Sequence, residues 1–406
     1  MTFKDFHFNS ELQEGISAMG FNEPTPVQQQ AIPLIMENKE VIACAQTGTG
    51  KTAAYLLPTL NDLVTHRTQN ISTLIIVPTR ELAVQIGQQL EGFSYFTDIS
   101  SITIYGGSDG ATFDRQKTAL KEGTEIVVAT PGKLMSHLNL GYVNLKHLKH
   151  FILDEADRML DMGFFDDIMR IASYLPEKRQ TLLFSATMPP KIRQLAKNLQ
   201  NDPAEVNIAI SKTAAGILQA AFVLYDNQKL PLLEHLLKAK SVSSLIVFCA
   251  RKVTVKEIAS AIQGLDYEIA AISSDLEQKD REEIMRKFKN KQLQILVATD
   301  ILSRGIDVEG IELIINYDVP NDAEDYVHRV GRTARADQKG AAFTFIGPKE
   351  QRSFAQIEEL IELDITKAKV PDYIGDTPSY SPNSSRGRSK GGGRKGGGKG
   401  RSKSRN

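Results

Sequence analysis

Three carboxylates crowd the end of a short apolar run at residues 151–157, FILDEAD. Carboxylates repel one another and resist removal from water, so a buried segment is a poor place for them without a partner. The grouping therefore predicts a cation at Asp154, with Glu155 and Asp157 beside it. The alternative is an exposed acidic turn that caps the following helix, because acids suit a helix N-terminus.

A glycine-rich segment upstream gives that cation a purpose. Residues 43–52, ACAQTGTGKT, follow an apolar run and lead into a helical segment, the strand–loop–helix setting of a phosphate-binding loop. Its glycines let backbone N–H groups turn toward phosphate oxygens, and the next helix N-terminus adds its positive dipole end. The alternative is a glycine-rich turn with an incidental GKT. The expected nucleotide-binding residues are Ala45 (where the general pattern has glycine), Gln46, Thr47, Gly48, Thr49, Gly50, Lys51 and Thr52.

The two segments together predict hydrolysis of a nucleoside triphosphate. Lys51 would reach the β- and γ-phosphates, and Thr52 and Asp154 would hold Mg²⁺, partly through water. Glu155 would polarise the attacking water. Phosphoryl transfer needs little more from a protein than positioning and charge neutralisation.

Alternating elements must position these groups. Short apolar runs rich in β-branched residues recur, and segments with helical spacing, such as residues 80–93, lie between them. This alternation predicts βαβ units and mostly parallel sheets buried on both faces. The expected strands are residues 41–45, 73–77, 102–105, 125–130, 151–153 and 181–187, then 219–225, 244–250, 268–272, 293–300, 312–318 and 341–347.

The length of 406 residues suggests two α/β domains with extensions. We expect a first domain at 1–208, a linker at 209–216, a second domain at 217–370 and a tail at 371–406. The tail cannot bury enough apolar surface to offset its conformational entropy, so disorder is expected there.

The net charge of +0 hides an asymmetry between the body and the tail. Residues 384–406 carry nine Lys or Arg and no acid, which leaves 40 basic and 49 acidic residues in 1–383. Nine cations on a flexible Gly/Ser chain resemble a non-specific tether for a polyanion such as RNA; the alternative is a tail that only aids solubility. The chain shows no secretory signal or membrane span, and its two cysteines lack metal-ligand spacing, so a cytoplasmic protein is expected.

DEAD at residues 154–157 and AQTGTGKT at 45–52 resemble the motifs of the DEAD-box ATP-dependent RNA helicases. Further motifs follow in that family's order across residues 3–335, and the short core with its basic tail resembles bacterial members such as the RhlE-like group. The resemblance implies two tandem RecA-like domains that use ATP and Mg²⁺.

GFNEPTPVQ at residues 20–28 resembles the family's Q motif, with Phe3 as its upstream aromatic. A glutamine amide can both donate to and accept from an adenine edge. Gln28 is therefore expected to select ATP, and Phe21 to stack on the base. The stretch also has the features of a turn before a helix, and the two interpretations are compatible.

Other motifs resemble the family's coupling and RNA-contacting elements. The coupling residues implied are Asp157, Ser185, Thr187 and His328. The RNA-contacting residues implied are Pro78, Thr79, Arg80, Gly106, Gly107, Thr130, Pro131, Gly132 and Lys133 in the first domain, and Arg251, Gln278, Arg281, Thr299 and Asp300 in the second. Such loops contact phosphate and sugar and so position a strand without identifying its bases. Lys133 departs from the family's usual arginine, which keeps the charge but loses the planar fork.

The second domain has no phosphate loop and must contribute otherwise. HRVGRTAR at residues 328–335 resembles the motif whose arginines reach the γ-phosphate, which assigns Arg332 and Arg335 as arginine fingers. The alternative is an exposed basic helix. ATDILSRGID at 298–307 resembles the family's motif that touches both ligands, which implies Gly305 near phosphates and Asp307 near the ribose. ISSDLEQ at 272–278 departs from the family's usual His-Gly-Asp turn.

The expected function is an ATP-dependent RNA helicase that unwinds or remodels short duplexes, acts as a monomer and contacts single strands with little sequence specificity. The alternative is an ATP-dependent RNA-binding clamp or assembly platform with little unwinding, which would use the same residues. A DNA-translocating helicase fits the motifs less well. The sequence names no protein partner.

Overall fold

The structure, a computed structural model, describes residues 1–45, 48–107, 110–208, 217–239, 241–273, 275–299, 310–320, 322–333 and 340–382, without the side chains of Gln278 and Glu324. Several expected site residues lie outside these ranges: Gln46, Thr47, Asp300, Gly305, Asp307 and Arg335. The expected linker, 209–216, lies outside them as well. Within the described ranges, no helix is long and apolar enough to cross a membrane.

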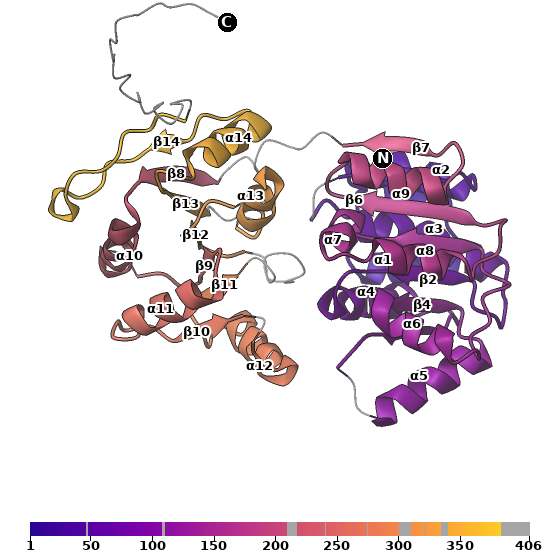
Figure 1. The fold of residues 1–406 in the computed structure, drawn as a ribbon. Coiled ribbons are helices and arrows are strands. Elements are labelled where there is room, and N and C mark those ends of the chain that lie inside the picture. The colour runs from indigo at the N-terminus through magenta and orange to yellow at the C-terminus, as the bar shows by residue number, and fades with distance from the viewer. Residues whose placement is uncertain are drawn as a thin grey trace, which may run out of the picture.

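A seven-stranded parallel sheet forms the centre of the first domain (Figure 1). Its strands lie in the order β3-β4-β2-β5-β6-β1-β7. They are β1 (Val41–Cys44), β2 (Thr73–Ile76), β3 (Ser101–Ile104), β4 (Ile126–Ala129), β5 (His150–Leu153), β6 (Gln180–Ser185) and β7 (Ala204–Asn207). The edge strand β7 was not predicted, because its polar sequence AEVN lacks an apolar run.

Helices cover both faces of this sheet (Figure 1). They are η1 (Phe3–Phe6), α1 (Ser10–Ala18), α2 (Pro26–Met36), α3 (Lys51–Thr65), α4 (Arg80–Phe93), α5 (Gly110–Glu122), α6 (Pro131–Asn139), α7 (Ala156–Asp161), α8 (Phe165–Ala172) and α9 (Pro190–Leu199). Successive strand residues serve opposite cores: Ile152 packs with α1–α4, and Phe151 and Leu153 pack with α6–α9. This two-sided burial explains the unbroken apolar runs.

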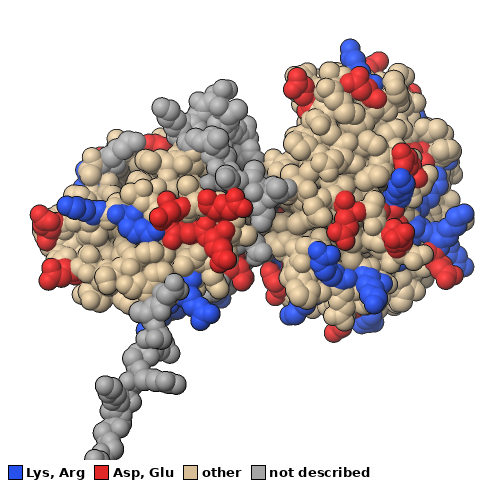
Figure 2. Space-filling model, turned by 90° about the horizontal axis from the view of Figure 1, so that it is seen from above, with Lys and Arg blue, Asp and Glu red and all other residues tan. Residues whose placement is uncertain are grey.

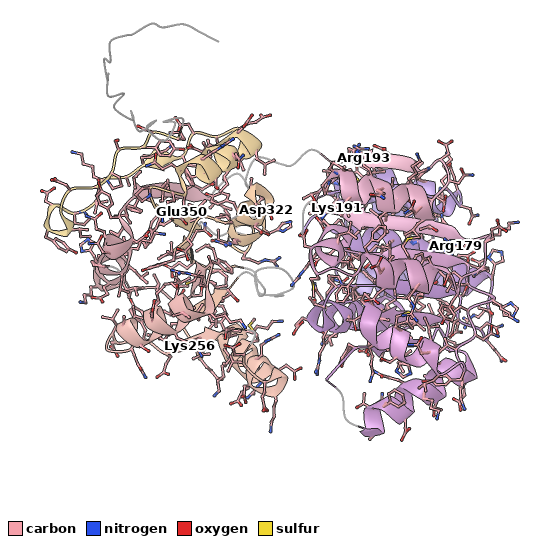
Figure 3. The ribbon with its side chains drawn as sticks, viewed as in Figure 1. Arg179, Lys191, Arg193, Lys256, Asp322 and Glu350 are labelled. Carbon is pink, nitrogen blue, oxygen red and sulfur yellow. The ribbon has the colours of Figure 1, made fainter. Side chains whose placement is uncertain are left out.

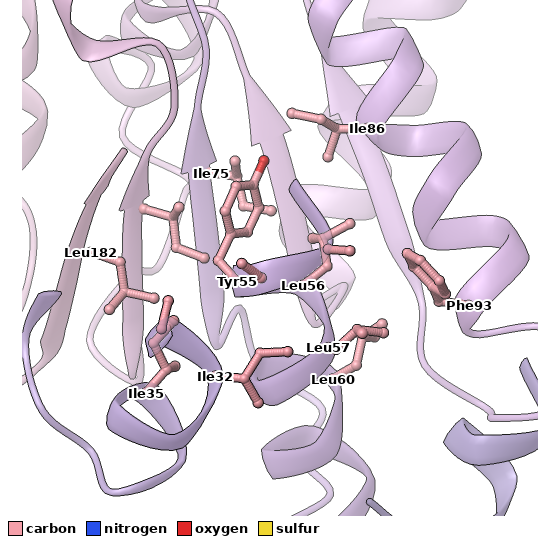
Figure 4. Close-up of a cluster of buried hydrophobic side chains, with 14 of the residues drawn as sticks. Ile32, Ile35, Tyr55, Leu56, Leu57, Leu60, Ile75, Ile86, Phe93 and Leu182 are labelled. Carbon is pink, nitrogen blue, oxygen red and sulfur yellow. The ribbon is translucent and has the colours of Figure 1, made fainter. Parts of the chain in front are cut away.

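The core between the sheet and helices α2–α4 supports the phosphate loop (Figure 4). Ile32 and Leu57 are fully buried there, together with Ile75 and Leu182 from the sheet. The Tyr55 ring lies in the same cluster, with its hydroxyl at one side of it (Figure 4). The first turn of α3 is therefore anchored by apolar packing directly below the loop.

A second seven-stranded parallel sheet follows, in the order β10-β11-β9-β12-β13-β8-β14. Its strands are β8 (Leu218–Val223), β9 (Leu245–Cys249), β10 (Ile269–Ile272), β11 (Ile295–Thr299), β12 (Leu313–Asn316), β13 (Ala341–Ile346) and β14 (Thr366–Lys367). Its helices are α10 (Asp226–Ala239), α11 (Lys252–Ile262), α12 (Gln278–Lys289), α13 (Ala323–Val330), α14 (Gln351–Ile361) and η3 (Asp372–Ile374). The order repeats that of the first sheet strand for strand, so β8, β9 and β12 correspond to β1, β2 and β5.

The chain after residue 370 packs on the second domain as far as Pro382, although disorder was predicted from 371. Tyr380 donates to Glu358 of α14 at 2.7 Å, and Gln228 donates to the carbonyl of Asp376 at 2.9 Å.

Acidic side chains gather on the second domain where it is seen from above (Figure 2). The end of α14 and the turn after it carry Glu358, Glu359, Glu362 and Asp364.

Candidate nucleotide and RNA site

The strand order separates two sets of loops along the first sheet. Because the strands are parallel, the expected motifs all follow carboxyl ends at one edge, where ligands of open α/β sheets bind. The phosphate loop, SAT and DEAD follow the neighbours β1, β6 and β5. The expected RNA loops follow β2, β4 and β3, which form the other half. DEAD and SAT thus lie between the phosphate loop and the RNA side.

Two glycines with positive φ shape the phosphate loop. Gly48 has φ +83° and Gly50 has φ +87°, the left-handed region that glycine adopts without strain. A Cβ on Gly50 would lie 2.4 Å from Nε2 of Gln28, so the loop and the Q motif are packed in contact. Lys51 is buried at the start of α3 and donates to the carbonyl of Ala45 at 2.7 Å.

Gln28 joins the Q motif to the phosphate loop. Its Nε2 donates to the Gly50 carbonyl at 3.0 Å, and its Oε1 accepts the Thr25 N–H at 2.8 Å. A glutamine amide has two N–H donors and two acceptor lone pairs, so each end keeps capacity for a ligand. Phe21 is edge-on to Phe3 at 5.8 Å between ring centroids, which fixes the expected base-stacking ring.

Asp154 is buried at the end of β5 and is held on both carboxylate oxygens. Oδ1 accepts the Glu155 N–H at 2.9 Å, and Oδ2 accepts the Tyr55 hydroxyl at 2.8 Å. Burial raises the pKa of Asp154 to about 6, although the Lys51 ammonium favours its ionised form. A buried carboxylate at this corner of the sheet is therefore suited to a cation.

Glu155 occupies the left-handed region at φ 50° and ψ 50°, which is costly for a side chain with a Cβ. The turn separates its side chain from that of Asp154 and starts α7. Its carboxylate lies 3.3 Å from Nη1 of Arg158, with 12% of the Glu155 side chain exposed. Strain of this kind is common at functional sites, which agrees with the predicted water-activating role.

The predicted coupling residues of the first domain lie together. Oδ2 of Asp157 accepts the N–H groups of Ala186 and Thr187, each at 3.1 Å. The Asp157 N–H donates to the Ser185 hydroxyl at 3.3 Å. The end of β6 is therefore bonded directly to the first turn of α7, so a shift at DEAD must move SAT.

The predicted RNA-contacting cations of the first domain lie against aromatic rings. Arg80 lies over the Tyr105 ring at 4.7 Å, and Lys133 over the Phe113 ring at 4.7 Å. Gly107 has φ +81°, and a Cβ there would lie 3.2 Å from Nη1 of Arg80. Neither aromatic residue was predicted. Each cation lies over the face of its ring, a contact that does not use the N–H edge of the Arg80 guanidinium.

Two ion pairs join the RNA sides of the two domains. Arg80 lies 2.7 Å from Glu282 of α12, and Arg281 of α12 lies 3.9 Å from Glu81 of α4. Each pair therefore links a predicted RNA-contacting arginine of one domain to an acid of the other. Neither Glu81 nor Glu282 was predicted as a site residue.

The remaining predicted RNA residues of the second domain lie after neighbouring strands. Arg251 is exposed and precedes α11, and Thr299 is buried at the end of β11. The strands β9, β10 and β11 form one half of the second sheet, so the loops after them lie together, as the predicted RNA loops do in the first domain. Asp300 and the side chain of Gln278 lie outside the described residues.

Helix α13 carries the predicted finger Arg332 just after its end. Arg332 is buried and its Nε donates to the His328 carbonyl at 3.3 Å. Arg329 is completely buried and donates to Asn316 at 2.9 Å, with its guanidinium 5.1 Å from the Phe248 ring centre. Arg329, which was not assigned as a finger, therefore fastens α13 to the sheet.

A buried ion-pair network in the second domain was also missed. Lys229 of α10 lies 3.0 Å from Asp318 and 2.9 Å from Glu350. Burial acts to lower the pKa of Lys229, but the Glu350 and Asp318 carboxylates outweigh it and raise that pKa. Asp318 also accepts the Ala250 N–H at 2.8 Å, next to Arg251.

Two family models match the sequence. Residues 25–195 match the DEAD/DEAH box helicase model, and residues 228–337 match the helicase conserved C-terminal domain. The chain belongs to the DEAD-box helicase family. The resemblance predicted from the DEAD and GKT segments is confirmed.

Relatives of this DEAD-box helicase share most of its length. The DEAD-box ATP-dependent RNA helicase CshA of Bacillus subtilis (strain 168) is 42% identical over 372 residues, 91% of this chain and 74% of that protein. CshA of Geobacillus kaustophilus (strain HTA426) is 40% identical over 371 residues, 91% of this chain and 79% of that protein. S. cerevisiae Dbp5 bound to RNA and ADP BeF3 matches with a TM-score of 0.81 at 28% identity, over 92% of this chain and 96% of that chain. The predicted fold of two RecA-like domains and the predicted helicase class are confirmed.

The donor groups of this DEAD-box helicase fit a nucleotide-borne Mg²⁺. Within the described ranges, no cluster of three or more His, Cys, Asp or Glu could hold a metal ion by itself. Mg²⁺ in nucleotide sites is held by one or two protein oxygens together with phosphates and water. Asp154 and Thr52, beside the loop at Gly48 and Gly50, meet that requirement.

Proposed function

We propose that this DEAD-box protein is an RNA-stimulated ATPase that uses ATP and Mg²⁺ to unwind short RNA duplexes locally. The observation that carries the proposal is the bonding of Asp157 to the SAT backbone, between the phosphate loop and the RNA loops of one sheet. The family supports RNA and ATP as ligands, and Dbp5, a structural relative, has been seen with RNA and ADP BeF3.

The first domain would bind the nucleotide. Gln28 and Phe21 recognise the adenine, the loop at Gly48 and Gly50 surrounds the phosphates, and Lys51 neutralises them. Asp154 and Thr52 would hold Mg²⁺, which supplies charge neutralisation at the phosphates when it is bound. Glu155 orients the attacking water.

The second domain would complete the site by closing on the first. Arg332, and Arg335 by the motif, would then stabilise charge on the γ-phosphate. RNA would cross both domains through the loops after β2, β3, β4, β9, β10 and β11. Because Arg80 and Arg281 are paired with acids here, RNA phosphates must replace those acids. Each ligand then favours the closed state that the other needs.

Local closure on one strand explains unwinding without translocation. A strand bent along the two RNA surfaces cannot remain in a straight duplex, so a few base pairs separate. ATP hydrolysis removes the γ-phosphate that the fingers contact, and the clamp opens. The protein would work as a cytoplasmic monomer, with the basic residues of 384–406 raising the local concentration of RNA.

The first test compares ATPase activity with RNA, with DNA of the same sequence and without nucleic acid. We expect strong stimulation by RNA only, and loss of at least a hundredfold in Lys51→Ala and Glu155→Gln. Equal stimulation by DNA would contradict the RNA assignment, and near-normal turnover in either variant would contradict the site. A strand-displacement assay on a short duplex separates the helicase from the clamp with little unwinding.

A further inference from the structure

Tyr55 lies one turn after Lys51 on α3, where residues four apart share a helix face. Its side chain is completely buried, and its ring lies 5.0 Å from the Phe184 ring. Figure 4 shows the ring among apolar side chains and the hydroxyl at one side of the cluster. A phenylalanine would fill this space equally well, so apolar packing does not require the hydroxyl.

The hydroxyl of Tyr55 contacts one of the residues assigned to Mg²⁺. It donates to Oδ2 of Asp154 at 2.8 Å. With the Glu155 N–H on Oδ1, the Asp154 carboxylate has a donor on each oxygen and cannot rotate freely.

We propose that the Tyr55 hydroxyl is a positioning group for Mg²⁺, holding Asp154 in the orientation in which it receives the ion with its nucleotide. The inference rests on the proposed function. Mg²⁺ demands near-ideal octahedral geometry, so a misdirected carboxylate costs it affinity. Outer hydrogen bonds that orient such ligands are worth about 10–100-fold in metal affinity or activity.

The test is Tyr55→Phe, with Tyr380→Phe as the matched control. Tyr380 also donates from its hydroxyl to a carboxylate, that of Glu358, at 2.7 Å, but it lies on the second domain away from the phosphate loop. Calorimetry on the full chain would measure the affinity for a non-hydrolysable ATP analogue with excess Mg²⁺ and with EDTA. The quantity of interest is the gain in affinity that Mg²⁺ provides.

We expect this gain to fall about tenfold in Tyr55→Phe, with the affinity in EDTA within about twofold of wild type. The Mg²⁺ concentration for half-maximal ATPase should rise in parallel, and Tyr380→Phe should behave as wild type. An unchanged gain, or an equal loss with and without Mg²⁺, would overturn the inference, because the latter is the mark of a damaged pocket. A wild-type chain that binds the analogue equally in both solutions would instead overturn the proposed Mg²⁺ cofactor, and the role of Tyr55 with it.

Discussion

Equivalent corners of the two sheets each carry a lysine and an aspartate, but the partners of these residues differ. In the first domain, Lys51 begins α3 after the glycine-rich sequence that follows β1, and Asp154 directly follows β5. In the second, Lys229 and Asp318 occupy the corresponding positions beside β8 and β12, where residues 224–225 alone join β8 to α10. There the lysine is paired with Asp318 and Glu350.

The difference shows how the same strand order can give a ligand-binding corner in the first domain and a structural corner in the second. Lys229 has two carboxylates for its one charge and needs no ligand. At the first corner burial outweighs the help that Lys51 gives Asp154, so that carboxylate remains short of positive charge. In the proposed function, the Mg²⁺ that accompanies the nucleotide would supply the missing cation. The short β8–α10 turn leaves no cradle for phosphates.

Asp154→Asn should separate activity from stability most sharply. We expect RNA-stimulated ATPase to fall about 10²–10³-fold, because the carboxylate proposed to hold Mg²⁺ is lost. Because burial raises the pKa of Asp154 to about 6, the folded state loses stability as pH rises from the ordinary pKa of this carboxyl through about 6. The neutral amide should therefore stabilise the first domain at pH 8 by about 1–2 kcal/mol. Urea unfolding in EDTA measures whether the free energy of unfolding rises or falls. A loss of stability at pH 8 would contradict the contrast between the corners.

Lys229→Met should have the opposite effect on stability. Removing the lysine leaves Asp318 and Glu350 facing each other without a cation, which should cost the second domain about 3 kcal/mol. Circular dichroism during urea unfolding would measure this change, while the first domain's affinity for the ATP analogue should stay within twofold. Unchanged stability would show that this corner, too, is poised for a ligand.

Glu282→Gln tests whether the ion pair between the predicted RNA-contacting sides of the two domains competes with RNA. The variant removes the acid paired with Arg80, so RNA affinity without nucleotide should rise about two- to fivefold, the value of a partly exposed ion pair. Glu283→Gln is the matched control, because Glu283 is the next residue of α12 and pairs with Lys287 of its own helix at 2.8 Å. Fluorescence anisotropy with a labelled single strand measures both. Equal gains in the two variants would mean that only net charge changed.

Asp62→Asn should change stability modestly and leave the two corners untouched. Asp62 of α3 bonds to Nε2 of His150 at 3.1 Å and so ties α3 to β5 at the ends remote from Lys51 and Asp154. The hydrogen bond from His150 lowers the pKa of Asp62, so its contribution is present above its ordinary value near 3.8 and is lost as pH falls below that. We expect a loss of about 1 kcal/mol at pH 7 that vanishes in acid. An acid unfolding curve identical to wild type would contradict this.

The strands and their loops were predictable because periodicity and loop chemistry are local. The run 80–93 matches α4 residue for residue, and the expected strands agree with β1–β6 and β8–β13 to within a few positions. The edge strands β7 and β14 were missed because polar, partly exposed strands carry no apolar run. The packed segment 371–382 was missed because its composition is that of a disordered chain, although Tyr373 and Tyr380 were aromatic exceptions in it.

The motifs of the candidate site could be found in the sequence, but their arrangement in space could not. Strand order depends on crossovers between distant segments, so the sequence could not show that SAT lies between DEAD and the phosphate loop. Partners such as Glu282 for Arg80 or Glu350 for Lys229 arise only from tertiary packing. Tyr55 alone had a signal, its spacing of one helical turn from Lys51.

The most direct test of the account is the distance between the two domains in the presence of ligands. Lys191 and Asp322, both exposed, lie on facing sides of the first and second domains and have no proposed role (Figure 3). Cysteines at these positions, in a chain with Cys44 and Cys249 replaced by alanine, would carry spin labels for pulsed dipolar spectroscopy. The distance should shorten only when RNA and a non-hydrolysable ATP analogue are both present. An unchanged distance in a labelled protein that still hydrolyses ATP with RNA would contradict a site completed by domain closure.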